Sequence, residues 1–288
     1  MKRLPYRFRS PLARPFKPRL ANWQRCRVAE APALRLDGGL KLRRFFLPVA
    51  DAAAVGRRII FVSDLHYNAT AEEDRRIDAL TEALFGLRGD ILLLGGDAVG
   101  DACRMKGLPR ALRRFAACAD TALAVPGNWE RGKRWLGIDF WRGVYADGGF
   151  ELLCTESREA GAFYVYGSDE LVHGFPELPP ERGGEGRFRI LLCHRPDTVI
   201  SFDSGDRLSS WQLALCGHTH GGQWRLPFLG ALYVPSFYWR TLDRGWFRRR
   251  GEELRMFVSP GAGELSLPGR FACPREAAVV DLVPVAEV

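Results

Sequence analysis

The sequence predicts an α/β fold in which two β-sheets pack against each other. Apolar strands alternate with amphipathic helices between residues 58 and 128, which indicates a parallel sheet with right-handed crossover connections. From residue 150 onward, short apolar runs follow one another with little helix between them, which indicates a second sheet. Several of these strands are followed directly by Asp, Asn or His, at the carboxyl edge where open α/β sheets bind ligands.

The first half contains three expected strands and two expected helices. A helix over 71–88 follows from apolar residues at helical spacing and from an acidic first turn, and Pro109 lies near the start of the second helix. The strands are short apolar runs that end in glycine or in a motif residue. The expected strands are 58–63, 90–94 and 121–125, and the helices are 71–88 and 109–119.

The second half consists mainly of expected strands, and residues 170–187, rich in Pro and Gly, are expected to form a surface loop near the site. We expect a single domain over residues 51–288, preceded by a basic, aromatic arm and leading strands over residues 1–50. The expected strands are 150–154, 162–167, 188–193, 211–216, 231–234, 254–259 and 277–283.

The charge of the chain favours an anionic partner. The formal net charge is +8, and residues 1–20 hold seven Lys or Arg, no acid, four Pro and three aromatic residues. This arm suits an anionic membrane surface, but it also suits a segment that docks on its own domain, and the sequence leaves both open. No nucleic-acid-binding motif accompanies the charge, so no nucleic-acid partner is expected.

The cysteines and the hydropathy pattern indicate a cytoplasmic setting. The seven cysteines are odd in number and widely spaced, and no CxxC pair occurs, which favours reduced thiols. No apolar run approaches the ~18 residues of a spanning helix, and no secretory signal is apparent at the N-terminus.

Five short motifs supply two Asp, one Asn and four His near the ends of expected strands. Two adjacent divalent cations need a shared carboxylate, and glycine lets the backbone turn close to them. Residues two apart in a strand face the same side, so the paired ligands in the first and last motifs are expected to face one site. This inventory indicates metal-activated hydrolysis of a phosphate ester or anhydride. The motifs are Ser63-Asp64-Leu65-His66, Gly95-Gly96-Asp97, Gly127-Asn128, Cys193-His194 and Gly217-His218-Thr219-His220.

In this order, the five motifs resemble the calcineurin-like metallophosphoesterase family from about residue 58 to about residue 282. The resemblance implies a four-layer α/β sandwich of two mixed sheets flanked by helices. It also implies two divalent metal ions, with Mn²⁺ expected and Fe or Zn²⁺ as alternatives. The first metal would be held by Asp64, His66, Asp97 and His220, and the second by Asp97, Asn128, His194 and His218, with Asp97 bridging.

One position departs from the family pattern. Many members have His after the Gly-Asn pair, whereas this chain has Trp129, whose indole donates one neutral hydrogen bond and cannot act as a general acid. Arg195 and Arg131 are candidates to replace that His, although Arg131 is more simply explained as a surface residue. The expected catalytic residues are Asn128, His194 and Arg195, and the expected substrate contacts are Trp129, Glu130, Arg195 and His173. An exposed loop His without a role remains the alternative for His173.

Three further segments are similar to a bacterial membrane-associated branch of the family, namely 194–197, 217–223 and 259–263. That branch includes pyrophosphatases that cleave UDP-2,3-diacylglucosamine to UMP and lipid X in lipid A synthesis. The resemblance therefore implies a lipid-linked phosphate substrate and a peripheral location on the inner face of the cell membrane. The alternatives are a general phosphodiesterase for another phospholipid or a nucleotide, and a non-catalytic metal-binding scaffold. A scaffold would be expected to lack a ligand, and none is missing.

An aromatic cluster follows the last motif. It could form a groove for acyl chains beside the site, but packing of the second sheet explains most of its members equally well. The cluster consists of Trp224, Phe228, Phe237, Tyr238, Trp239 and Trp246.

Overall fold

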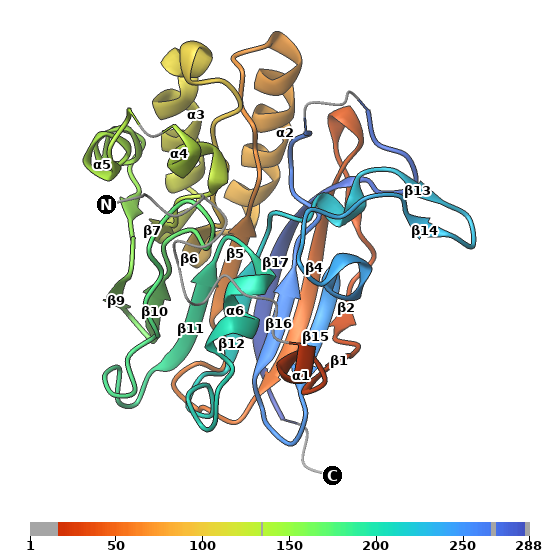
Figure 1. Ribbon diagram of the computed structural model, residues 1–288. Coiled ribbons are helices and arrows are strands. Elements are labelled where there is room, and N and C mark those ends of the chain that lie inside the picture. Colours follow the sequence, from red (N-terminus) through yellow and green to blue (C-terminus); the bar gives the residue numbers. More distant parts are fainter. Residues whose placement is uncertain (1–16, 134, 266–268, 286–288) are drawn as a thin grey trace, which may run out of the picture.

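The computed structural model describes residues 17–133, 135–265 and 269–285. The basic arm expected over residues 1–20 therefore lies largely outside the described residues, which begin at α1 (Lys17–Leu20). The fold consists of two large sheets with helices on their outer faces (Figure 1).

The first sheet has eight strands, and its central strands are parallel, as the sequence predicts. The parallel run is β5 to β8, and the long strand β17 lies antiparallel to β5 and parallel to β4. In spatial order the sheet contains β2 (Ala29–Glu30), β4 (Leu40–Val49), β17 (Arg275–Pro284), β5 (Arg58–Val62), β6 (Gly89–Leu94), β7 (Ala119–Ala124) and β8 (Glu151–Leu152), and β3 (Leu34–Arg35) pairs with β4.

The second sheet has seven strands and is also mixed. Strands β10, β11, β12 and β16 run parallel, and antiparallel strands extend both edges. In spatial order it contains β1 (Trp23–Arg25), β15 (Gly245–Arg249), β16 (Arg255–Val258), β12 (Leu213–Cys216), β11 (Phe188–Cys193), β10 (Phe163–Gly167) and β9 (Glu156–Ala160).

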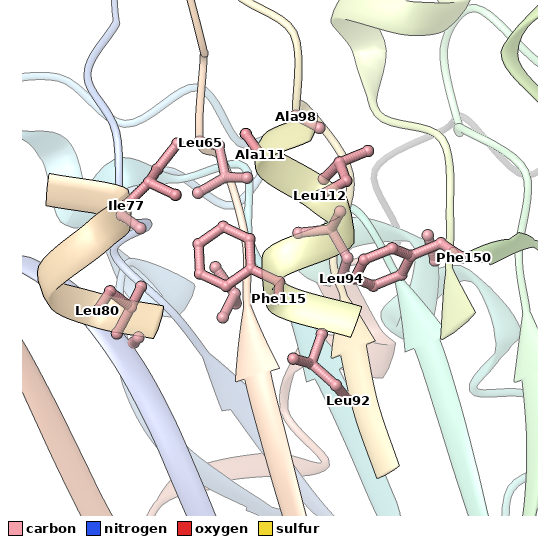
Figure 2. Close-up of a cluster of buried hydrophobic side chains, with 14 of the residues drawn as sticks. Leu65, Ile77, Leu80, Leu92, Leu94, Ala98, Ala111, Leu112, Phe115 and Phe150 are labelled. Carbon is pink, nitrogen blue, oxygen red and sulfur yellow. The ribbon is translucent and has the colours of Figure 1, made fainter. Parts of the chain in front are cut away.

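Alternating side chains of the central strands supply two separate cores. In β6, Ile91 and Leu93 pack between the sheets, whereas Leu92 and Leu94 face the helices. Figure 2 shows the helical side, where side chains from α2 and α3 lie against those of β6. Because both faces are buried, the strand is apolar without a period of two, which is why the sequence shows a continuous run.

Helices cover the outer faces of both sheets and complete the four layers. Helix α2 begins after Thr70, whose hydroxyl accepts the Glu73 N–H at 3.2 Å while the Glu73 carboxylate accepts the Thr70 N–H at 3.1 Å. Side chains of α2, α3 and α5 pack on the first sheet, and those of α6 pack on the second. The remaining helices are α2 (Ala71–Leu87), α3 (Leu108–Ala116), α4 (Asn128–Gly132), α5 (Ile138–Asp147) and α6 (Pro196–Phe202).

Three expectations for the second half need correction. The strand expected at 277–283 is β17, which lies in the first sheet because its alternate side chains fill both the helical core and the core between the sheets. The strand expected at 150–154 also joins the first sheet, as β8. The strand expected at 231–234 is only the short β14 (Gly230–Ala231), which pairs with β13 (Arg225–Leu226) in a hairpin that projects from the body (Figure 1).

All seven cysteines lie in the described part of the chain and none is in a disulfide. Cys193 and Cys216 face each other in register on β11 and β12 and are fully buried, which fits small core residues. Within the described ranges, no helix has both the length and the apolar character needed to cross a bilayer.

Candidate active site

The seven predicted metal ligands meet at one edge of the two sheets. Asp64 and His66 follow β5, Asp97 follows β6, and Asn128 follows β7, and these three strands are neighbours. His194 follows β11, and His218 and His220 follow the adjacent β12. Each ligand therefore extends from the carboxyl end of a parallel strand, as the sequence predicts.

The backbone that presents these ligands differs from the prediction. Strand alternation was expected to align Asp64 with His66 and His218 with His220, but both strands end before these residues. Instead, five of the seven ligands have left-handed backbone conformations: Asp64, His66, Asp97, His218 and His220, with φ between 45° and 69°. Such φ values are uncommon outside glycine and mark functional sites where surrounding contacts hold a strained turn.

The ligand atoms form two adjoining groups. Asp64 Oδ1 lies 3.5 Å from His220 Nε2, which lies 3.1 Å from His66 Nε2. In the second group, His194 Nε2 lies 3.2 Å from His218 Nδ1 and 3.0 Å from Asn128 Oδ1. With Asp97 counted in the second group, each group has three Asp or His ligand atoms within 4.8 Å of one another.

Asp97 lies between the two groups. Its Oδ2 is 3.3 Å from His194 Nε2 and 3.7 Å from His66 Nε2, one imidazole from each group. Its Oδ1 accepts the Trp129 N–H at 2.8 Å, which fixes the carboxylate plane. This placement fits the bridging role that the resemblance implies for Asp97.

Two imidazoles are oriented by backbone carbonyls. His194 Nδ1 lies 2.8 Å from the Gly95 carbonyl oxygen, and His218 Nε2 lies 2.5 Å from the Pro235 carbonyl oxygen. A proton on each of these nitrogens leaves the lone pair of the other nitrogen directed into the site. Such partners set the tautomer of metal-binding histidines.

Two glycines are required by close approach. A Cβ on Gly127 would lie 2.1 Å from Asp97 Oδ1, and a Cβ on Gly217 would lie 1.9 Å from Ser63 Oγ and 2.2 Å from Asp64 Oδ2. Any other residue at either position would displace a ligand carboxylate. This confirms the sequence argument that the motif glycines allow tight packing at the site.

Glu130 does not contact substrate, contrary to our prediction. Its side chain is fully buried, and its two oxygens accept the backbone N–H groups of residues 97, 98, 99 and 127. The Tyr145 hydroxyl donates to the same carboxylate at 3.1 Å. Glu130 therefore holds the Asp97 loop against the Asn128 loop and faces away from solvent.

Trp129 lies next to a ligand of the first group, and Arg195 lies next to a ligand of the second group. The Trp129 ring meets His66 edge-on with centroids 5.3 Å apart. Arg195 is paired with the buried Glu170 carboxylate, and its Nη2 lies 3.4 Å from Asn128 Oδ1. Arg131 is ion-paired with Asp169 at 2.9 Å and its side chain is only 17% exposed, so it is not the ordinary surface residue that the sequence suggested.

His173 lies in the 170–187 loop and is half-buried. Its backbone N–H donates to Glu170 at 2.6 Å, so it neighbours the carboxylate that holds Arg195. Contact between its side chain and substrate remains a prediction.

Sequence reasoning missed two supporting residues. Glu170 anchors Arg195, and the half-buried Arg270 donates to the carbonyls of residues 260 and 263 while its Nη2 lies 3.2 Å from His220 Nδ1. Neither residue belongs to a motif, and only the fold brings them to the site.

Most of the imidazoles are neutral at physiological pH. Burial lowers the pKa of His66 to about 4, and it lowers the pKa of His218 and His220 well below the ordinary value. Neutral imidazole is the form that binds cations, so these three side chains are ready to act as ligands.

His194 and Asp97 form a charged pair within this buried set. Burial opposes charge on both groups, but Asp97 raises the pKa of His194 to about 9, and His194 holds the pKa of Asp97 below its usual range. Burial also raises the pKa of Asp64 to about 7. Carboxylates and imidazoles this closely packed fit a site that compensates its charge with divalent cations.

The donor set fits two such cations. It offers carboxylate oxygens, one amide oxygen and imidazole nitrogens, with no thiolate, which is the chemistry of Mn²⁺, Fe or Zn²⁺ sites. Asp64, His66 and His220 would hold one cation, and Asn128, His194 and His218 the other, with Asp97 shared.

Two cavities adjoin the ligands. A polar cleft of about 570 Å³ opens over His66 and is lined also by Trp129 and Lys133. An apolar cavity of about 360 Å³ lies beside it, lined by Thr219, Trp224 and Tyr233 among others. Leu265 borders both, so the two cavities are neighbours.

The comparisons with known proteins agree with this site. The model of the calcineurin-like phosphoesterase family matches residues 57–222, which is more than half of the chain and includes all seven predicted ligands. The chain therefore belongs to the calcineurin-like phosphoesterase family.

Three relatives share much of the chain. Phosphodiesterase YaeI of Escherichia coli is 29% identical over 69% of this chain and 73% of its own. An uncharacterized metallophosphoesterase of Helicobacter pylori (strain ATCC 700392 / 26695) is 26% identical over 79% of this chain and 60% of its own. YkuE of Bacillus subtilis, an uncharacterized metallophosphoesterase, is 28% identical over 56% of this chain and 55% of its own.

Proposed function

We propose that this chain is a two-metal hydrolase that cleaves the pyrophosphate of UDP-2,3-diacylglucosamine, giving UMP and lipid X. The observation that carries the proposal is the pair of neighbouring cavities, one polar and lined by the predicted ligand His66, the other apolar, with Leu265 on both. A lipid-linked phosphate likewise has a polar part, the phosphate, and an apolar part, the acyl chains. The apolar cavity falls within the ~300–1,000 Å³ range of ligand pockets.

The reaction adds water across the anhydride. The water oxygen bonds to one phosphorus, the bridging P–O bond breaks, and both products leave as phosphate monoesters with release of a proton. Bound divalent cations, with Mn²⁺ proposed and Fe or Zn²⁺ as alternatives, would supply Lewis acidity and lower the pKa of water to about 7.

The residues around the site would hold the phosphates in place. Arg195, kept in position by buried Glu170, places its guanidinium beside Asn128, where it can hold phosphate oxygens in a fixed geometry. Asn128 and His194 adjoin it on the reacting side. Trp129 supplies an apolar wall where many relatives supply a proton donor, which suits a phosphate leaving group that needs none.

A phosphodiesterase acting on another phospholipid or on a nucleotide is the second candidate. The name of the Escherichia coli relative, phosphodiesterase YaeI, favours it. Both candidates use the same ligands, and they differ in whether the uridyl and glucosamine groups are needed. For the lipid-linked candidates we propose a peripheral location on the inner face of the cell membrane.

Release of UMP distinguishes the candidates. We expect the purified chain with Mn²⁺ to release UMP from UDP-2,3-diacylglucosamine with kcat/KM at least about tenfold above that for UDP-N-acetylglucosamine, which lacks the acyl chains and so leaves the apolar cavity unfilled. Tenfold corresponds to about 1.4 kcal/mol, less than burial of one large apolar side chain contributes. Hydrolysis of bis-p-nitrophenyl phosphate without UMP release would reject the substrate and retain the hydrolase.

A further inference from the structure

The segment from Trp224 to Trp239, here named the aromatic hairpin, exposes an unusual amount of apolar surface. It contains eight of the 16 large hydrophobic side chains that are exposed in the described residues. Its tip residue Phe228 is fully exposed, and Leu229 and Tyr233 are 62% and 59% exposed. Patches of this kind on soluble proteins mark interaction surfaces.

The six residues of the aromatic cluster that follows the last motif fall into two sets, one buried and one exposed. Tyr238 and Trp246 are buried and pack in the second sheet, as one of the two sequence interpretations predicts. Trp224, Phe228, Phe237 and Trp239 are exposed and lie on the aromatic hairpin. Packing of the core therefore does not explain these four residues.

Two exposed residues of the aromatic hairpin, one at its tip and one at its C-terminal end, have a strained backbone. Phe228 has a φ of 64° and Trp239 a φ of 51°, a conformation that bulky residues rarely adopt. Phe228 gains no burial within the chain that would offset this cost. An outlier of this kind indicates selection for something other than folding.

The base of the hairpin is attached firmly to the catalytic edge. The Pro235 carbonyl is the partner of His218 Nε2, and the buried Asp197 carboxylate accepts the Phe237 N–H at 2.7 Å and the Ser236 hydroxyl at 3.0 Å. Trp224 and Tyr233 line the apolar cavity next to the site. Residues at the base of the hairpin therefore line the cavity. The strands β13 and β14 project from the body of the molecule (Figure 1).

The charge of the aromatic hairpin and its flanking residues indicates what kind of partner it binds. Residues 220–242 contain no Asp or Glu. The two charged side chains of this stretch are Arg225, which is ion-paired with Asp243 at 2.6 Å, and Arg240. Arg240 is exposed next to Trp239, with its guanidinium carbon 5.8 Å from the ring centroid. Aromatic and leucine side chains on a projecting tip, with arginine behind them, are the pattern of segments that enter the interface of an anionic bilayer.

We propose that the aromatic hairpin inserts its tip into the headgroup and acyl boundary of an anionic phospholipid bilayer. The tip, with Phe228 and Leu229, enters the apolar boundary, and Trp224, Tyr233 and Trp239 lie at headgroup level. The apolar cavity then opens toward the lipid. The membrane proposal depends on the proposed function only for the claim that the bound lipid is the substrate.

Vesicle binding by the full chain tests the proposal. The double variant Phe228→Ser/Leu229→Ser removes the tip and changes no residue that lines either cavity. The matched control, Phe85→Ser/Leu34→Ser, removes one Phe and one Leu that are also exposed but lie on α2 and β3. We expect co-sedimentation with phosphatidylcholine–phosphatidylglycerol vesicles to fall at least tenfold in the tip variant and to be unchanged in the control.

Further readouts separate the alternatives. Hydrolysis of bis-p-nitrophenyl phosphate in solution should be the same for the chain and both double variants, which shows that the site is intact. Equal vesicle binding by the tip variant and the unaltered chain would overturn the proposal, because another segment would then hold the membrane. So would a tip-dependent dimer in lipid-free solution, since the hairpin would then bind a second copy. Failure of UMP release alongside tip-dependent vesicle binding would reject only the substrate.

Discussion

Replacing Asp97 with Asn should lower kcat/KM for phosphoester hydrolysis by more than about 100-fold. Asp97 is the one ligand whose Oδ2 lies near imidazoles of both groups, 3.3 Å from His194 and 3.7 Å from His66. An amide keeps the shape but removes the negative charge that two adjacent cations would share. Loss of partners outside the coordination sphere already costs about 10–100-fold in metalloenzymes, so loss of the shared ligand should exceed that.

The control for this variant is Asp120→Asn, at the opposite end of the same sheet. Asp120 is exposed on β7 and paired only with the exposed Arg88, so its loss should leave activity within about twofold, since exposed pairs contribute little. Circular dichroism should show native folds for both variants. Activity of Asp97→Asn within tenfold of the unaltered chain would contradict a shared-carboxylate site.

Replacing Glu130 with Gln should lower the free energy of unfolding by about 3 kcal/mol and reduce activity with it. Five hydrogen-bond donors converge on this carboxylate: four backbone N–H groups and the Tyr145 hydroxyl. A glutamine must turn its NH₂ group toward some of these donors, which leaves them buried without an acceptor. Each buried donor left without an acceptor costs about 1–3 kcal/mol, so the loss of one or two acceptor contacts accounts for the expected change.

Denaturant unfolding measures this effect, with Glu82→Gln as the control. Glu82 lies on the exposed face of α2, where the same substitution should change stability by less than about 0.5 kcal/mol. A Glu130→Gln chain with unaltered stability and activity would show that the carboxylate does not hold the two loops together.

The strands and the ligands could be predicted because each follows from a local pattern. The run Ile91 to Leu94 is apolar on both faces, so it could only be a buried strand, and Asp97 comes directly after it. In parallel neighbours, such residues must meet at one edge. This pattern predicted that the seven residues lie at one edge, and the resemblance to the calcineurin-like family implied their roles as ligands.

The parts that could not be predicted depend on contacts between distant segments. The left-handed turns at Asp64 and His218 are held by tertiary contacts, including the His218 N–H donated to Asp64 at 3.0 Å. Glu130 resembled a substrate contact because only the fold shows that it faces backbone amides. Likewise, β17 lies in the first sheet because residues 275–284 pair with β4, which precedes it by more than 200 residues.

Exposure could not be predicted for the aromatic cluster either. Tyr238 and Trp239 are adjacent and chemically similar, yet one is buried and the other is 46% exposed. Composition carries no information on which of the two faces the core. The hairpin is a candidate membrane surface because the fold leaves its apolar side chains exposed on a projecting segment.

The metal content of the purified chain tests the central claim most directly. After removal of metals by a chelator, reconstitution with Mn²⁺ and removal of excess ion, elemental analysis should find two ions per chain, as the two ligand groups predict. The Asp97→Asn chain should retain one ion or fewer under the same conditions. A folded, unaltered chain that retains no more than one ion, or that hydrolyses phosphodiesters equally well without metal, would contradict the two-metal account.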